Sequence, residues 1–171
     1  AEKWQRTIQD LSKAKIAHGD LQHGNVMITP GGDIKLVDYD GMCVPALVGR
    51  RNLEIGVEPY QHPSRDGETK LSLDLDNFSA AFIYVGLRAL AVEPDLWDEF
   101  VVKPEYDKML FRKEDFVDPR QSALFQRLRR SSDSDVQRLA TTLHEVSRVE
   151  IDQVPFLDDL LFSWDQVNVV L

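Results

Sequence analysis

The sequence predicts a mostly helical α+β fold with one β-hairpin near its start. Residues 3–15 carry apolar side chains at helical spacing, namely Trp4, Ile8 and Leu11. Residues 76–90 (DNFSAAFIYVGLRAL) are apolar almost all round, which is typical of a helix buried within a helical domain. Between these segments, two short apolar runs flank residues 30–32 (PGG), where glycine supplies the positive φ that a tight turn needs.

The middle of the chain has weaker patterns. Residues 40–73 are predicted to form a long ordered loop, because glycine and proline recur throughout them. Loops of this length are uncommon in compact domains and are often functional. Residues 94–118 mix aromatic and charged side chains without a periodicity that assigns an element, and residues 122–130 are expected to be helical.

Two further helices are predicted near the end. Ser132 and Asp135 form a capping box for a helix running to about Ser147. A last helix is expected over residues 154–164, with Pro155 in its first turn.

Composition bounds the class of protein. The 171 residues suffice for one sizeable domain, and a net charge of −9 argues against nucleic acid as a partner. The single cysteine, Cys43, excludes an internal disulfide and a cysteine-based zinc site, which favours a reducing, cytoplasmic location. No apolar run approaches the ~20 residues of a membrane span, so no membrane is expected. The chain starts without Met in an amphipathic, helix-like segment, which suggests a piece of a longer protein.

A cluster of polar side chains in HGDLQHGN carries the chemistry. His18, Asp20 and Asn25 have the spacing of the kinase catalytic loop, H-R-D-x-x-x-x-N, and Asp38 follows the hairpin in LVDYDG. Phosphoryl transfer needs cations against the triphosphate oxygens, and Mg²⁺ prefers oxygen ligands. It also needs a carboxylate that orients the acceptor hydroxyl and takes its proton.

These residues and two later motifs resemble the protein-kinase-like superfamily, specifically the C-terminal lobe of a bacterial-type, eukaryotic-like Ser/Thr kinase. Residues 60–63 (YQHP) stand where kinases carry Y-x-A-P-E, and residues 76–79 (DNFS) are similar to the D-x-W-S that opens the buried central helix. The resemblance covers residues 4–90 and is faint afterwards. It implies a C-lobe with the β-hairpin at the catalytic cleft.

The resemblance also implies roles for five residues. Asp20 would be the catalytic base, and Asn25 and Asp38 the metal ligands for Mg²⁺ and ATP. His18 would pack beside the loop as structural support. Asp76 would tie the loop to the central helix through backbone N–H groups.

The whole chain, residues 1–171, is expected to be this lobe. No Gly-rich loop or V-A-I-K-like strand precedes the catalytic loop, so the N-terminal lobe that supplies half of the ATP cleft is absent, and its cofactor-binding residues are unknown. We therefore expect a full-length parent enzyme, a phosphotransferase, and little activity from this lobe without its N-terminal partner lobe.

Several residues depart from the protein-kinase pattern. Gly19 replaces the Arg that reads a phosphorylated activation loop, and residues 38–63 contain no Ser or Thr, so that switch is not expected. Gln22 replaces a Lys, and H-G-D-L…G-N is similar to aminoglycoside and choline kinases. Asp40 takes the place of the Gly in D-F-G, and Ser64 that of the Glu in A-P-E, so the ion pair built on that Glu is in doubt.

Three functions remain open on these residues. A protein Ser/Thr kinase is favoured by Asp20, Asn25 and Asp38 together and by the two later motifs. A small-molecule phosphotransferase is favoured by Gly19 and the missing Lys. A pseudokinase or adaptor would bind a protein partner through the helical lobe. Zinc binding by His18 and His23 lacks a third ligand, and Asp40 is expected to be an exposed turn residue rather than a second ligand.

Overall fold

The secondary structure comes from a computed structural model that describes residues 1–103 and 109–167, with side chains described as far as residue 162. The α-helices are α1 (Glu2–Lys13), α2 (Asn77–Val92), α3 (Asp95–Trp97), α4 (Lys113–Val117), α5 (Ala123–Arg129), α6 (Ser134–Val146) and α7 (Leu157–Val167). The strands are β1 (Val26–Ile28) and β2 (Ile34–Leu36). Short helical turns are η1 (His23–Asn25), η2 (Pro45–Leu47), η3 (Asp98–Val102) and η4 (Ile151–Gln153). The mostly helical α+β prediction is therefore confirmed.

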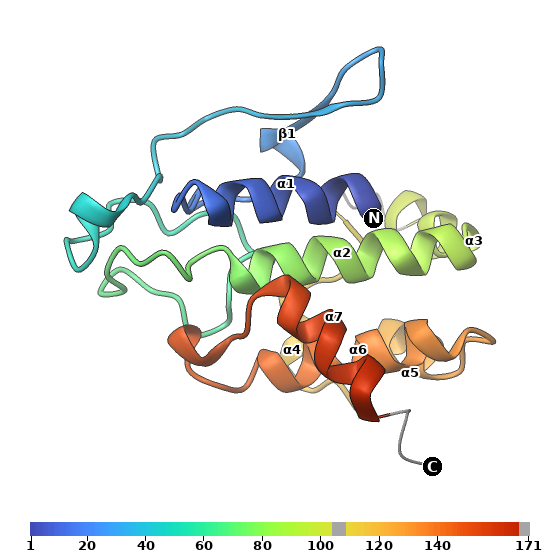
Figure 1. The fold of residues 1–171 in the computed structure, drawn as a ribbon. Coiled ribbons are helices and arrows are strands. Elements are labelled where there is room, and N and C mark those ends of the chain that lie inside the picture. Colours follow the sequence, from blue (N-terminus) through green and yellow to red (C-terminus); the bar gives the residue numbers. More distant parts are fainter. Residues whose placement is uncertain (104–108, 168–171) are drawn as a thin grey trace.

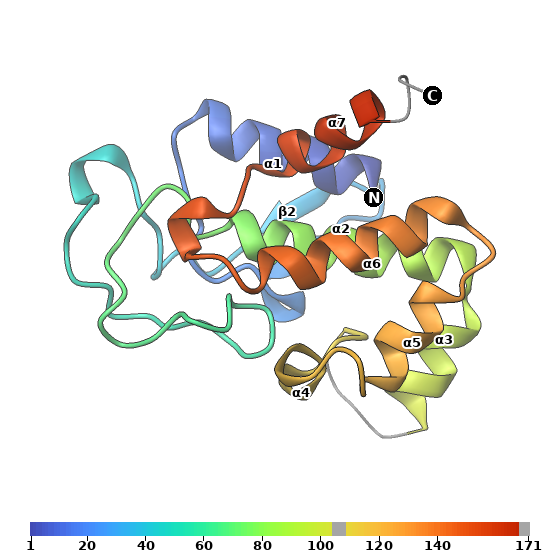
Figure 2. The same cartoon turned by 90° about the horizontal axis from the view of Figure 1, so that it is seen from below.

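Helix α2 forms the centre of the core. Its side chains are buried on every side, as with Phe78 and Phe82, and it contacts α1, α3, α6 and α7. Figure 1 shows α1 running antiparallel beside α2, and Figure 2 shows α6 along another side of it. Because α1 ends where α2 begins, the residues that follow α1 lie beside Asp76 at the start of α2.

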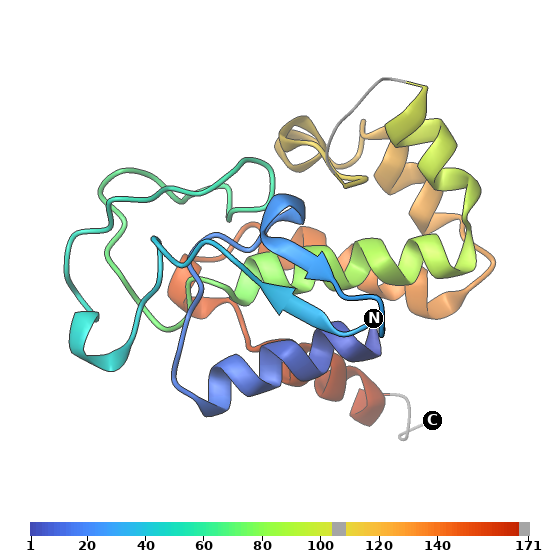
Figure 3. The ribbon, with the colours of Figure 1, turned by 90° about the horizontal axis from the view of Figure 1, so that it is seen from above.

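The β-hairpin lies over the pair α1 and α2 (Figure 3). Its strands pair antiparallel, with Val26 opposite Leu36 and Ile28 opposite Ile34. Gly32 turns the chain with φ +78°, and its N–H donates to Thr29 O at 2.8 Å. The hairpin predicted from the PGG turn is confirmed.

The segment between the hairpin and α2 is irregular but ordered, as predicted for residues 40–73. Besides η2, it contains only isolated bridges within the described residues, Ala17 with Cys43 and Arg51 with Lys70. Figures 1 and 3 show it extending beyond the end at which α2 begins. Cys43 is buried there with a free thiol.

Two predictions about helix starts are wrong. Helix α6 is capped by Asp133, whose carboxylate accepts from the N–H groups of Asp135 and Val136, and Ser132 is not the cap. Ser132 and Asp133 are both favourable N-cap residues, so the path of the preceding chain decides which of them caps the helix. Helix α7 begins at Leu157, so Pro155 precedes its first turn.

The other helix predictions hold. Residues 122–130 contain α5, and the Ser122 hydroxyl caps it by accepting from Phe125 N–H at 3.1 Å. Residues 94–118, which the sequence left unassigned, contain α3, η3 and α4. Within the described part of the chain, no helix combines the length and the apolar character that crossing a membrane requires.

Candidate active site

The loop of residues 18–25 is anchored to the start of α2 by one buried carboxylate. Asp76 accepts hydrogen bonds from the backbone N–H of His18 at 2.5 Å and of Gly19 at 2.8 Å. Burial raises the pKa of Asp76, while these two N–H groups and the charge of Arg65 act in the opposite direction. Two donors on one acceptor set the direction in which the chain leaves α1 and enters the loop.

The His18 side chain joins the loop to the end of β2. Its ring is fully buried, and Nε2 lies 3.1 Å from Val37 O. Because a carbonyl oxygen only accepts, Nε2 carries the hydrogen, and Nδ1 is left to accept from Asp20 N–H at 3.4 Å. The ring also contacts Tyr39, with 5.1 Å between centroids. His18 thus spans two neighbouring segments from a position away from solvent.

Asp20 and Asn25 are held together by the two hydrogens of one amide group. Asn25 Nδ2 donates to Asp20 O at 2.8 Å and to Asp20 Oδ2 at 3.0 Å. This arrangement uses both donors of the Asn25 amide and leaves its Oδ1 available as an oxygen ligand. Asn25 is buried, whereas Asp20 is half-buried.

Asp38 stands at the open end of the hairpin, one residue after the partner of Asn25. The residue before it, Val37, donates its N–H to Asn25 O at 3.1 Å, which continues the ladder by one pair. The Asp38 side chain is exposed, and its backbone has φ +66°. A positive φ in a non-glycine residue costs about 1–2 kcal/mol and occurs disproportionately at functional sites. Asp40, two residues on, is also exposed.

A later segment covers the other oxygen of Asp20. Val57 N–H donates to Asp20 Oδ1 at 3.0 Å, and Gln61 Nε2 donates to the same atom at 3.3 Å. In addition, Tyr60 OH lies 3.0 Å from His23 Nδ1, and the two rings are stacked. Sequence reasoning missed Val57 and Gln61 as neighbours of Asp20. The YQHP motif was the available signal that this stretch returns to the loop.

The glycine that replaces the Arg of H-R-D is required by packing. Gly19 has φ +84°, and a Cβ added to it would lie 2.0 Å from Gly41 O. The backbone after Asp38 therefore passes directly over Gly19, and any larger side chain would displace it. This contact is a physical reason for the missing Arg.

A neutral hydrogen-bond network stands where the Glu of A-P-E would form an ion pair. His62 is buried, with Nε2 3.1 Å from Val146 O near the end of α6. Nε2 is therefore the donor, and His62 Nδ1 accepts from the Ser64 hydroxyl at 2.8 Å. Burial lowers the pKa of His62 and favours this neutral form.

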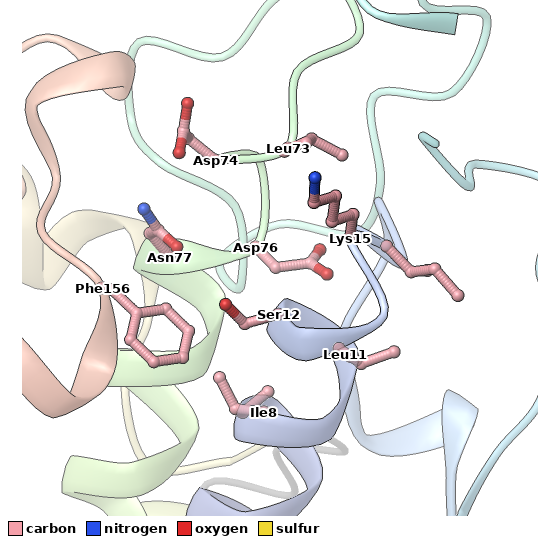
Figure 4. Close-up of a pocket in the computed structure, with 10 residues that line it drawn as sticks. Ile8, Leu11, Ser12, Lys15, Leu73, Asp74, Asp76, Asn77 and Phe156 are labelled. Carbon is pink, nitrogen blue, oxygen red and sulfur yellow. The ribbon is translucent and has the colours of Figure 1, made fainter. Parts of the chain in front are cut away.

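A cavity of about 190 Å³ is lined by residues around the end of α1 and the start of α2, and not by the loop of residues 18–25. Figure 4 shows Ser12, in the last turn of α1, and Lys15, just after that helix, on the side to which Asp76 points, with Asn77 and Phe156 on the other side. The cavity lining includes none of Asp20, Asn25 and Asp38. It therefore shares Asp76 with the loop's support but is separate from the candidate base and metal ligands.

The donor set suits a hard cation better than zinc. Asn25 Oδ1 and the Asp38 carboxylate offer oxygen atoms, the donor type that Mg²⁺ prefers, and Asp38 follows Val37, which is paired with Asn25. Among the side chains described, those of residues 1–103 and 109–162, no three from His, Cys, Asp or Glu gather as a metal site. The alternative of zinc at His18 and His23 thus has no third ligand among these residues.

Comparison with known proteins gives one local similarity. The chain is 34% identical over 70 residues to the probable serine/threonine-protein kinase mkcD of Dictyostelium discoideum. The match covers 40% of this chain and 11% of that much longer protein. The similarity is thus to a kinase, over this part of the chain alone. No protein-family model matches the chain.

Proposed function

We propose that this chain is the catalytic-loop lobe of a kinase that transfers phosphate from Mg-ATP to Ser/Thr hydroxyls of proteins. The observation that carries the proposal is the pairing of Asp20 with Asn25 next to Asp38. One amide holds the carboxylate and keeps its own oxygen unused, and Val37, the residue before the exposed Asp38, is paired with Asn25 in the hairpin. A base and two oxygen ligands at one edge are what phosphoryl transfer needs.

In this proposal Asp20 is the base. An ionised carboxylate has about four acceptor positions. Asn25, Val57 and Gln61 use three of those positions on Asp20, and the fourth would accept the proton of the substrate hydroxyl. The donors also prevent rotation of the carboxylate, so the free position keeps one direction.

Asn25 Oδ1 and Asp38 would hold the metal. Mg²⁺, when bound with ATP, neutralises charge on the transferring phosphate. The chain's own contribution is the hairpin, which keeps the two ligands at a constant separation, and the strained φ of Asp38, which sets the direction of its carboxylate. His18 would support the loop and the end of β2 through its hydrogen bonds with Asp20 N and Val37 O.

A protein substrate is supported by the segment beside Asp20. In the segment that leads to Val57, Leu53 is 82% exposed and Ile55 47% exposed, so apolar side chains face solvent within four residues of a donor to Asp20. Exposed apolar side chains that gather near a site favour contact with another chain. The name of the similar Dictyostelium protein, a probable serine/threonine-protein kinase, points in the same direction.

The test is transfer of labelled phosphate by the full-length protein. Asp20→Asn is expected to lower the rate at least 100-fold, since positioned acid–base groups contribute roughly 10²–10⁴-fold. Asp38→Asn is expected to lower it as well, because it removes the charged metal ligand. Asp40→Asn is the matched control, because Asp40 is exposed two residues from Asp38, and it is expected to retain activity within a few-fold.

Three other results would redirect the proposal. Label on small hydroxyl compounds but on no protein would identify the small-molecule alternative. Mg-ATP binding without transfer to any acceptor, or no nucleotide binding, would support a partner-binding pseudokinase. Equal activity of Asp20→Asn and the unchanged protein would refute the role of Asp20.

A further inference from the structure

The side chain of Gln61 bridges a buried cation and the candidate base. Its Oε1 accepts from Arg65 Nη1, and its Nε2 donates to Asp20 Oδ1 at 3.3 Å. Gln61 is 6% exposed, so its amide has little contact with water. The bridge links two charged groups of opposite sign through one neutral amide.

Arg65 determines which way the Gln61 amide faces. A guanidinium group only donates, and an ionised carboxylate only accepts. The amide therefore satisfies both neighbours in one orientation, with oxygen toward Arg65 and nitrogen toward Asp20. If the amide were reversed, Nε2 would face a donor and Oε1 would face the carboxylate, so both contacts would become repulsive.

Arg65 is itself buried in an unusual way. It is 8% exposed and donates to Gln61 Oε1 and to Glu54 O at 2.9 Å, while its Nε is buried without an acceptor among the described residues. Burial lowers the pKa of Arg65, and the charges of Asp76, Asp20 and Glu54 oppose this effect. A buried guanidinium with an unsatisfied N–H is costly, and stability alone is a weak reason to retain it.

The backbone at Gly56 passes close to the hydrogen bond between Gln61 and Asp20. Its φ is +81°, and an added Cβ would lie 2.5 Å from Gln61 Nε2 and 2.8 Å from Asp20 Oδ1. Without a side chain at this position, the next residue, Val57, brings its N–H within 3.0 Å of the same carboxylate oxygen. The segment therefore delivers two donors to Asp20, and one of them depends on Arg65.

We propose that Arg65 is a positioning residue that holds the Gln61 amide in its donating orientation toward Asp20 and thereby directs the free acceptor position of that carboxylate. Its consequence for catalysis rests on the proposed function, in which Asp20 is the base. The hydrogen-bonded bridge from Arg65 through Gln61 to Asp20 does not rest on that function, because it is a property of the folded protein. Arg65 touches neither substrate nor metal in this scheme and acts through Gln61.

The bridge is tested by NMR of the Gln61 side-chain amide in the full-length protein. The resonance is assigned by its loss in Gln61→Met. We expect Arg65→Met and Asp20→Asn each to shift it and to speed its exchange with water, because each removes one side of the bridge. Arg50→Met is the matched control, since Arg50 is exposed on the same segment, and it is expected to leave the resonance unchanged.

Kinetics of the same variants test the positioning role. Arg65→Met is expected to lower kcat about tenfold or more with little change in KM for ATP, because the base is misdirected while the metal ligands stay in place. Arg65→Lys keeps the charge and one donor to Gln61, so it is expected to recover part of kcat. If Arg65 had only a structural role, Arg65→Met would lower the melting temperature, and kcat would fall only in proportion to the folded fraction. Arg65→Lys would then show no recovery of kcat when compared at equal stability.

The outcomes separate the two proposals. An unchanged Gln61 resonance in folded Arg65→Met would overturn the bridge, whatever the activity. A shifted resonance with kcat unchanged in an active enzyme would overturn the positioning role. If the unchanged protein transfers no phosphate to any acceptor, the proposed function fails, while the Gln61 resonance still decides whether Arg65 sets the amide.

Discussion

Substituting Gly19 tests how closely the loop of residues 18–25 and the segment after Asp38 are packed. In Gly19→Ala, the new Cβ would meet Gly41 O at 2.0 Å, far inside van der Waals contact, and the residue would keep φ +84°. The neighbouring backbone must then move. The bridge between Ala17 and Cys43, with hydrogen bonds of 2.9 and 2.8 Å, is the nearest pairing that would be lost.

The magnitude follows from two contributions. The left-handed backbone costs about 1 kcal/mol for alanine, after allowing for the entropy that glycine loses on folding. Loss of the two bridge hydrogen bonds adds about 1 kcal/mol each. We therefore expect Gly19→Ala to lower the free energy of unfolding by about 3 kcal/mol, or the melting temperature by roughly 6–12 °C.

Variants at two other glycines separate the cost of the left-handed backbone from the cost of the steric clash with Gly41. Gly49 has φ +80° with no atom within 4 Å of an added Cβ, so Gly49→Ala should cost only the conformational term of about 1 kcal/mol. Gly67 has neither a positive φ nor a close neighbour, so Gly67→Ala should be neutral or stabilise by up to about 0.5 kcal/mol. Denaturant unfolding curves of the three variants measure the series. Equal costs for Gly19→Ala and Gly49→Ala would refute the close approach of Gly41.

Two further predictions concern Lys15 and His62. Lys15 follows α1 with φ +56°, the left-handed position of a helix C-terminus, so Lys15→Gly should raise the free energy of unfolding by about 0.5–1 kcal/mol in the same assay; a loss of stability would contradict it. Burial lowers the pKa of His62, so the folded protein binds a proton there less readily than the unfolded chain does. The neutral His62 therefore contributes stability above the usual histidine pKa near 6.5, and this contribution is lost as the pH falls through the lowered pKa. Stability measured from pH 7 to pH 5 should therefore fall less steeply in His62→Gln. Because His144 has a pKa lowered in the same direction, the comparison is made in a His144→Gln background, and an unchanged slope would exclude His62 as the source.

Local spacing was enough to predict much of the fold. The spacing of apolar residues in 3–15 indicated α1, because a helix repeats its buried face every three to four residues, and the almost wholly apolar run 76–90 indicated the buried helix α2. The PGG turn indicated the hairpin for a similar reason, since a tight turn depends on two or three consecutive residues. The motif around Asp20 was visible because its members lie within one loop.

Short-range choices between equivalent residues could not be predicted. Ser132 and Asp133 are both good helix caps, and the sequence offered no reason to prefer Asp133. The start of α7 at Leu157, rather than before Pro155, was equally undetermined. In each case the path of the chain outside the helix decides which side chain reaches the free N–H groups.

The surroundings of Asp20 were decided by tertiary structure. Gln61 is 41 residues away along the chain, and Val57 is 37 residues away. The sequence by itself indicated the longer helices, where the hairpin turns and which polar side chains share the loop of residues 18–25, because these depend on neighbours a few residues apart. Only the folded chain decided that Gly41 covers Gly19 and that Arg65 reaches Asp20 through Gln61, because such contacts depend on how distant segments pack.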